Sequence, residues 1–226
     1  MRSARTLKAS SRREQPHDCP HPMPSVTDTT MNRTSARIAP LGADDPRSRS
    51  SVIEELVNFI GYRPNALLTM ARKPGVVEEL LKLFALTVRG EGLLPQSLRF
   101  LVAAETARGA HCRYTTTHLV HGAHHVGVSW DKLAALPSYR DDPRFSDQER
   151  KALAIATAGG RLPVHEPAQA IEQAKQVFSD EEIVEIVSCV AMVGWFNRWN
   201  GLMASELEAE PSEAMAHVPW LLGLEI

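Results

Sequence analysis

The middle of the chain concentrates residues that can do chemistry: five of its nine histidines and one of its three cysteines lie between positions 111 and 125. Cys112 lies near the start of an expected helix, where free backbone N–H groups and the positive end of the helix dipole favour a thiolate. Arg113 adds a neighbouring cation. His118 lies about 120° around the helix from Cys112 and about 9 Å along its axis. Cys112 is therefore a candidate nucleophile, and His118 is a candidate proton carrier.

Four further residues of this segment are candidates for binding a substrate. Thr115 lies one turn from Cys112 and three residues before His118, so it bridges the two. The guanidinium of Arg113 can hold a carboxylate. The four candidates are Arg113, Tyr114, Thr115 and His121.

A metal site is the alternative use of the histidines. His118, His121 and His125 share one face of the expected helix, and this spacing permits metal ligation. No cysteine or carboxylate completes a recognised metal spacing, however, so we expect neither a metal nor another cofactor.

Helical periodicity surrounds this segment. From residue 48 onward, apolar residues recur at intervals of three and four, without the alternation of a half-buried strand. The first expected helix ends at Gly61, and the next three open near Pro64, Pro74 and Pro95; the helix that opens near Pro74 runs to Gly90. The helix with the histidines is expected over residues 111–126. The sequence thus predicts an all-α fold class.

The second half of the chain carries two copies of a capping-box signal, Ser146–Glu149 and Ser179–Glu182. The first begins a helix through Ala158, and the second begins a long helix that runs past Trp199 toward Glu208. Polar residues interrupt its apolar surface, and we expect them to form hydrogen bonds across the core or a subunit contact. They are Asn197, Arg198 and Asn200.

Charge and composition divide the chain. Residues 1–50 hold nine Lys or Arg against five Asp or Glu, and the remainder holds sixteen against twenty-two. Residues 1–47 are rich in Ser, Thr, Arg and Pro, so we expect a disordered extension, with Met31 as an alternative start. A helical domain follows over residues 48–210, and 211–226 form a C-terminal tail whose Trp220 segment docks on the body or on a neighbouring subunit.

Net charge, the length of the apolar runs and the cysteine spacing limit the classes of partner and the compartment. A net charge of −2 supplies no broad attraction for nucleic acid. The longest nearly apolar run, residues 186–196, falls short of the roughly 20 residues that span a bilayer, so no membrane is expected. Three widely spaced cysteines do not form a disulfide framework, which favours the cytoplasm.

The segment Cys112-x-Tyr114-x-x-x-His118 resembles the active helix of the alkylhydroperoxidase D and carboxymuconolactone decarboxylase family, which typically opens Cys-x-Tyr-Cys-x-x-(x)-His. The segments that begin at Phe145 and Phe178 resemble later helices of that family, so the resemblance covers about residues 45–210. It implies an orthogonal multi-helix bundle that assembles into homo-oligomers, trimers or larger, and acts on a small molecule.

Two positions depart from the pattern of the redox members of this family, in which two cysteines cycle between dithiol and disulfide while a His and a Glu relay protons. Thr115 stands at the second cysteine, so Cys112 has no resolving partner in the motif. Phe100 stands where the family's acid is common. Glu105 lies seven residues before Cys112, and we take it as the substitute acid and as a catalytic candidate.

These residues and the family resemblance are compatible with three alternative functions. The first is an alkylhydroperoxidase-like thiol oxidoreductase of the peroxiredoxin type, an antioxidant peroxidase in which Cys112 is oxidised and an external thiol reduces it. The second is a cofactor-free lyase of the decarboxylase type, in which His118 and His121 act on a small organic acid. The third is a catalytically silent member of the family.

Overall fold

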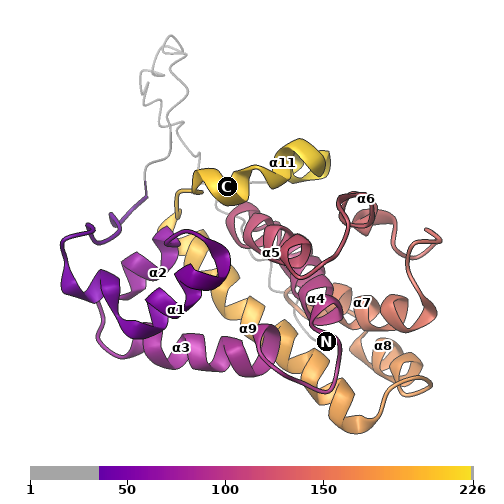
Figure 1. The fold of residues 1–226 in the computed structure, drawn as a ribbon. Coiled ribbons are helices and arrows are strands. Elements are labelled where there is room, and N and C mark those ends of the chain that lie inside the picture. Colours follow the sequence, from indigo (N-terminus) through magenta and orange to yellow (C-terminus); the bar gives the residue numbers. More distant parts are fainter. Residues whose placement is uncertain (1–35, 225–226) are drawn as a thin grey trace, which may run out of the picture. The chain divides into compact units, whose positions relative to one another are not determined.

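In the computed structural model, residues 36–224 are described, and every regular element among them is helical (Figure 1). The prediction of an all-α fold class is confirmed, while the expectations for residues 1–35 lie outside the described part. The α-helices are α1 (Ser51–Ile60), α2 (Asn65–Met70), α3 (Val76–Phe84), α4 (Gln96–Gly109), α5 (Arg113–His125), α6 (Trp130–Ala134), α7 (Asp147–Gly159), α8 (Pro167–Ala174), α9 (Asp180–Met203), α10 (Ala209–Ser212) and α11 (Ala214–His217). Single helical turns add η1 (Pro46–Arg49), η2 (Ala85–Arg89), η3 (Leu136–Ser138) and η4 (Pro219–Gly223).

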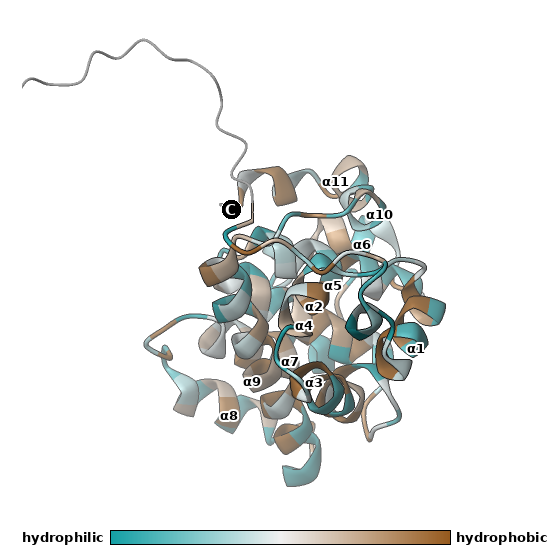
Figure 2. Ribbon diagram, turned by 90° about the vertical axis from the view of Figure 1, so that its left-hand side faces the viewer, coloured by the Kyte–Doolittle hydropathy of each residue, from teal (hydrophilic) through white to brown (hydrophobic). Residues whose placement is uncertain are grey.

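Helix α4 is the centre of the core. All residues from Leu98 to Ala107 are buried, and the helix packs against α5, α7 and α9. A helix buried on all sides needs other helices around it, and the outer ones carry hydrophobic and hydrophilic residues side by side, as α8 does in Figure 2. The position of α5, with its candidate residues, is therefore set by a buried scaffold helix.

The helix ends follow the local signals in the sequence. Gly61 adopts a left-handed conformation with φ 88° and donates its N–H to the carbonyl of Val57, which ends α1. Both capping boxes are present: Ser146 with Glu149 at the start of α7, and Ser179 with Glu182 at the start of α9.

Three helix ends differ from the expectation. The helix expected to run to Gly90 leaves α-helical geometry after Phe84 and continues as the π-helical turn η2, in which Gly90 donates its N–H to the carbonyl of Ala85. Helix α5 begins at Arg113 and not at residue 111, because His111 adopts a left-handed conformation with φ 56°. Cys112 is therefore the N-cap of α5.

The third difference is the end of α9, which stops at Met203 and does not run toward Glu208. Ala204 adopts a left-handed conformation with φ 48°, and the chain reverses there. The reversal brings residues 205–208 back toward α5.

Both flanks of the expected domain pack on the helices. The expected boundary at residue 48 lies too late, because Leu41 is buried and its N–H is bonded to the carbonyl of Leu68. At the other end Leu221 is fully buried, and the indole N–H of Trp220 donates to the carbonyl of Leu133 at 3.1 Å. The Trp220 segment thus docks on the body of its own chain.

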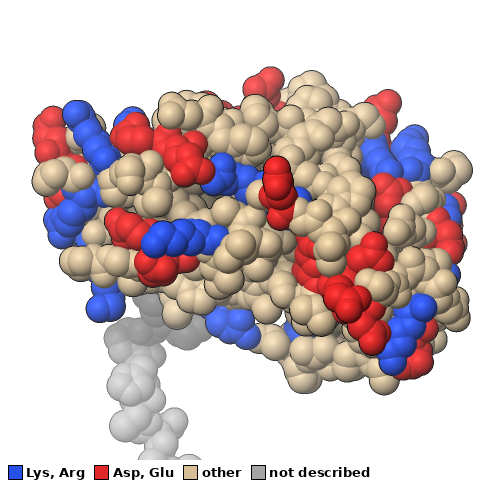
Figure 3. Space-filling model, turned by 60° about the horizontal axis from the view of Figure 1, so that its bottom comes forward, with Lys and Arg blue, Asp and Glu red and all other residues tan. Residues whose placement is uncertain are grey.

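None of the described helices is long and apolar enough to cross a bilayer. Acidic and basic side chains are both spread over the face drawn in Figure 3.

Candidate functional site

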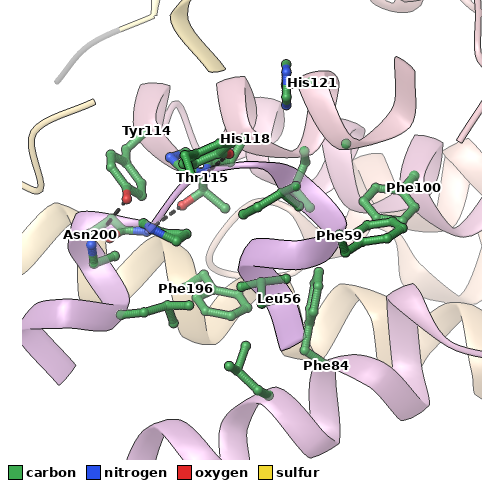
Figure 4. A pocket seen from close by; sticks show the side chains of 18 residues that line it. Leu56, Phe59, Phe84, Phe100, Tyr114, Thr115, His118, His121, Phe196 and Asn200 are labelled. Carbon is green, nitrogen blue, oxygen red and sulfur yellow. Dashed lines mark hydrogen bonds between the residues drawn. The ribbon is translucent and has the colours of Figure 1, made fainter. Parts of the chain in front are cut away.

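An apolar pocket of about 100 Å³ lies against the inner face of α5. Figure 4 shows Tyr114, Thr115, His118 and Asn200 gathered at one end of it, and the phenylalanines Phe59, Phe84 and Phe100 at the other. The complete lining comprises Leu56, Phe59, Ile60, Tyr62, Pro64, Ala66, Leu67, Leu81, Phe84, Phe100, Tyr114, Thr115, His118, Leu119, His121, Gly122, Phe196 and Asn200.

Cys112 lies one side chain away from this pocket. Its Sγ is 3.1 Å from Oγ1 of Thr115, and Thr115 lines the pocket whereas Cys112 does not. Thr115 is held by α9, because Asn200 Nδ2 donates to its Oγ1 at 3.0 Å. Ser205 in turn donates to Oδ1 of Asn200 at 2.8 Å. This chain of hydrogen bonds leaves the Thr115 proton free to point at the sulfur.

His118 is bound on both ring nitrogens. Its Nε2 lies 2.7 Å from Oε2 of Glu208, and its Nδ1 lies 2.9 Å from the hydroxyl of Tyr62. The other carboxylate oxygen, Oε1, accepts from the Tyr114 hydroxyl at 2.8 Å and from the backbone N–H of Asn65. The Glu208 carboxylate thus has three donors around it.

The protonation states follow from these partners. Burial by itself raises the pKa of Glu208, but the hydrogen bonds from His118, Asn65 and Tyr114 outweigh burial and hold this pKa below its usual range. The ionised carboxylate accepts a hydrogen bond, so Nε2 of His118 carries a proton. Nδ1 and the Tyr62 hydroxyl share the second hydrogen bond of the ring, and either of these two atoms can be its donor.

Burial and the nearby Glu208 charge raise the pKa of both tyrosines, so both hydroxyls stay protonated at neutral pH. Stacking fixes the imidazole further, since the ring centroids of Tyr114 and His118 are 4.3 Å apart. His121 lies at the edge of the same group, with its ring centroid 5.9 Å from that of Tyr62. Burial and the proximity of His118 lower the pKa of His121.

The structure brings together five of the residues singled out in the sequence: Tyr114, Thr115, His118 and His121 line the pocket, and Cys112 touches it through Thr115.

It places Arg113 and Glu105 elsewhere. Nε of Arg113 donates to the carbonyl of Leu224 at 2.8 Å, outside the pocket lining. Glu105 is fully buried, and its oxygens bind Arg108 at 2.7 Å and Thr157 at 2.8 Å. The acid beside His118 is Glu208.

Phe100 packs against the backbone of α5. A Cβ on Gly122 would approach Cε1 of Phe100 to 2.6 Å, so the ring fills the space beside that glycine. The position where the resembled family often has an acid is therefore an apolar wall of the pocket.

Two residues of the site, Tyr62 and Glu208, were not predicted from the sequence. Each lies outside the histidine segment, in a loop or at the start of a short helix, and neither belongs to a motif. For the metal alternative, residues 36–224 contain no group of three or more His, Cys, Asp or Glu that could hold an ion.

No family model and no curated protein matches the sequence. Among solved structures, a variant of the debrominase Bmp8 in complex with 2,3,4-tribromopyrrole is 26% identical, with a TM-score of 0.73 over 82% of this chain and 98% of that one.

Two peroxidase-related proteins are also similar. One, described as an alkylhydroperoxidase AhpD core and taken from Ralstonia eutropha JMP134, is 19% identical with a TM-score of 0.62, over 78% of this chain and 96% of that one. The other, from Silicibacter sp. TM1040, is 21% identical with a TM-score of 0.62, over 70% of this chain and 83% of that one. The chain therefore has the alkylhydroperoxidase D-like helical fold, which confirms the family resemblance of the α5 segment at the level of the fold.

Proposed function

We propose that this protein is a thiol-dependent oxidoreductase of the peroxidase type, in which Cys112 reduces a small uncharged organic hydroperoxide. The observation that carries the proposal is the contact of 3.1 Å between Cys112 Sγ and the pocket residue Thr115, at the N-terminus of α5. A thiolate at this position lies next to unpaired backbone N–H groups and within one side chain of an apolar pocket.

The reaction balances with a single cysteine. The Cys112 thiolate attacks the outer oxygen of the hydroperoxide, the O–O bond breaks, and an alkoxide leaves and takes up one proton to become the alcohol. Cys112 becomes a sulfenic acid. Two equivalents of an external thiol then return it to the thiol, with release of one disulfide and one water.

The thiol that reduces the sulfenic acid of Cys112 has to come from outside the described site. Thr115 cannot form a disulfide, and burial raises the pKa of Cys189 to about 12. The sulfur of Cys189 is committed to the carbonyl of Thr87, in a fully buried position. A small dithiol or glutathione-like reductant is the class of partner that this arrangement requires.

His118 and Glu208 are proposed as the proton-handling pair. His118 takes up the proton that Cys112 loses when it forms the thiolate, and the carboxylate 2.7 Å away stabilises the resulting imidazolium. The imidazolium then gives this proton to the leaving alkoxide and returns to the imidazole. Glu208 takes the role that the sequence assigned to Glu105.

A second substrate class is favoured by one observation, the similarity to Bmp8, named a debrominase and solved with a tribrominated pyrrole. The aromatic lining of the pocket suits a small halogenated ring. In such a reaction the carbon–bromine bond is replaced by carbon–hydrogen, bromide is released, and two thiols are oxidised to a disulfide. Cys112 would again be the attacking thiol.

The test is peroxide consumption by the purified full chain with dithiothreitol as reductant, using tert-butyl hydroperoxide as the small substrate. Cys112→Ser should abolish turnover, and a sulfenic-acid probe should label Cys112 after a peroxide pulse. Cys189→Ser is the matched control and should keep both signals. Turnover that survives Cys112→Ser would contradict the proposal. Bromide release from brominated pyrroles tests the second substrate class.

A further inference from the structure

Most polar groups on the pocket wall are already occupied. Thr115 Oγ1 accepts from Asn200 at 3.0 Å, and both ring nitrogens of His118 have partners. The Tyr114 hydroxyl donates to Glu208 at 2.8 Å and accepts from the backbone N–H of Ala66 at 3.2 Å. A ligand in the pocket finds little free capacity on these groups.

Tyr62 is different. Its hydroxyl shares one hydrogen bond with Nδ1 of His118, and within residues 36–224 His118 is the only hydrogen-bond partner of this hydroxyl. A phenolic hydroxyl can donate one hydrogen bond and also accept one, so one of these two functions is open. The Tyr62 side chain lines the pocket and is 7% exposed, so a group that could use this oxygen is a ligand inside the pocket.

The open function of Tyr62 sets what that ligand must offer. When Tyr62 donates to Nδ1 of His118, the ligand must donate to the phenolic oxygen; when Nδ1 donates, the ligand must accept from the hydroxyl. An O–H group on the ligand meets either requirement.

Charge and size limit the ligand further. No Lys, Arg, Asp or Glu belongs to the pocket lining, so a charged ligand would lose its hydration without gaining an ion pair. The volume of about 100 Å³ is smaller than the apolar cavity of about 150 Å³ that is known to hold benzene. The pocket therefore suits an apolar body no larger than about one small ring.

We propose that the pocket binds an uncharged molecule with an apolar body of about one ring and a single O–H group, and that Tyr62 forms the hydrogen bond with this group. The inference rests on the proposed function, because it names the ligand class of the same site. It excludes the small organic acid of the lyase alternative, since Arg113 lies outside the pocket lining and binds the carbonyl of Leu224.

The experiment compares phenol, toluene and fluorobenzene, which have nearly the same size and of which only phenol has a donor. Dissociation constants are measured by calorimetry on the full chain, on Tyr62→Phe and on the matched control Tyr139→Phe. Tyr139 is a second buried tyrosine, but its hydroxyl binds Thr157 and it lies outside the pocket lining.

In the unsubstituted chain and in Tyr139→Phe, phenol should bind at least as tightly as toluene and fluorobenzene. In Tyr62→Phe, the ratio of the phenol to the toluene dissociation constant should rise about tenfold, because the phenol hydroxyl is then buried without its hydrogen-bond partner. The dissociation constant of toluene should stay the same.

Two results would overturn the inference: phenol binding about tenfold more weakly than toluene in the unsubstituted chain, or the same ratio with and without Tyr62→Phe. The first comparison needs no variant, so it decides even if Tyr62→Phe fails to fold. Repeating the titration on Cys112→Ser separates the two proposals, because binding needs no thiol. Loss of peroxide turnover with an intact phenol preference would contradict the proposed function and leave this inference standing.

Discussion

At the start of α5, a threonine hydroxyl holds the place beside Cys112. Oγ1 of Thr115 is 3.1 Å from the Cys112 sulfur. A cysteine sulfur in the place of this oxygen would need only a small shift to reach the length of a disulfide bond. The difference between a one-cysteine and a two-cysteine site is therefore one side chain in an unchanged backbone position.

Thr115→Cys should convert the site to a dithiol. We expect oxidation to join Cys112 to the new cysteine, so that the variant loses two free thiols and gains peroxide turnover with a dithiol reductant. Counting free thiols before and after a peroxide pulse, together with the mass of the linking peptide, measures this.

Thr117→Cys is the control for that change. Thr117 is equally buried in α5, but it lies five residues from Cys112 and on a different side of the helix. It should keep both thiols free. The chain has two further cysteines, Cys19 and Cys189, so four free thiols in oxidised Thr115→Cys would show that the contact with Cys112 does not persist in solution.

At the scale of the elements, the site depends on where α9 ends. The left-handed Ala204 reverses the chain, and Glu208, four residues later, contacts His118 of α5. Tyr62 arrives from the loop between α1 and α2. Three segments far apart in the sequence thus supply one hydrogen-bonded chain.

Glu208→Gln should lower peroxide turnover by up to about 100-fold, because the amide no longer fixes the tautomer and orientation of His118. Glu206→Gln, an exposed neighbour on the same segment, should leave turnover unchanged. Initial rates at saturating reductant compare the two. Equal rates in both variants would remove Glu208 from the proton-handling pair.

Close packing of the helices gives a stability prediction. A Cβ on Gly160, at the end of α7, would lie 2.7 Å from the backbone carbonyl oxygen of Thr106 in α4, which cannot move aside freely. Gly160→Ala should therefore lower the free energy of unfolding by about 1–3 kcal/mol. Urea unfolding curves measure the loss.

Gly201→Ala is the matched substitution in α9, where a Cβ would meet nothing within 4 Å. It should leave the free energy of unfolding unchanged or raise it by up to about 1 kcal/mol, since alanine favours a helix. A similar loss in both variants would contradict the close contact between α4 and α7.

The helix boundaries that local sequence signals set could be predicted from the sequence. Gly61 and the two capping boxes act within one helical turn, so the helices that they bound could be placed from the sequence. Helix α8 was not predicted, although Pro167 at its first turn is a recognised start signal.

The candidate site was predicted only where it lies within α5. The approach of Glu208 to His118 depends on the reversal at Ala204, and alanine carries no signal for a left-handed conformation. Glu105 is a buried carboxylate, as a proton-handling acid would have to be, but it forms an ion pair with Arg108, three residues later on the same helix. Such competition between partners is decided by tertiary packing.

At the scale of the whole molecule, the buried Glu208 couples the fold to pH. Its pKa is lower in the folded chain than the ordinary value of 4.5, so the unfolded chain takes up this proton more readily. The stabilisation is complete above about pH 4.5. It is lost as the pH falls from there through the folded-state pKa.

The stability of Glu208→Gln should consequently depend less on pH in the acid range. Urea midpoints taken from pH 7 down to pH 3 should fall less steeply in this variant than in the unsubstituted chain, and Glu206→Gln should follow the unsubstituted chain. Parallel curves for all three proteins would show that the carboxylate of Glu208 contributes no linkage.

The order in which the chain is synthesised gives the reversal at Ala204 a further meaning. Tyr62 and His118 leave the ribosome long before Glu208, which follows the whole of α9. Until residues 205–208 fold back, neither the imidazole nor the Tyr114 hydroxyl has its carboxylate partner. A nascent chain that ends before Glu208 thus carries Cys112 and His118 without the carboxylate of the proposed proton-handling pair.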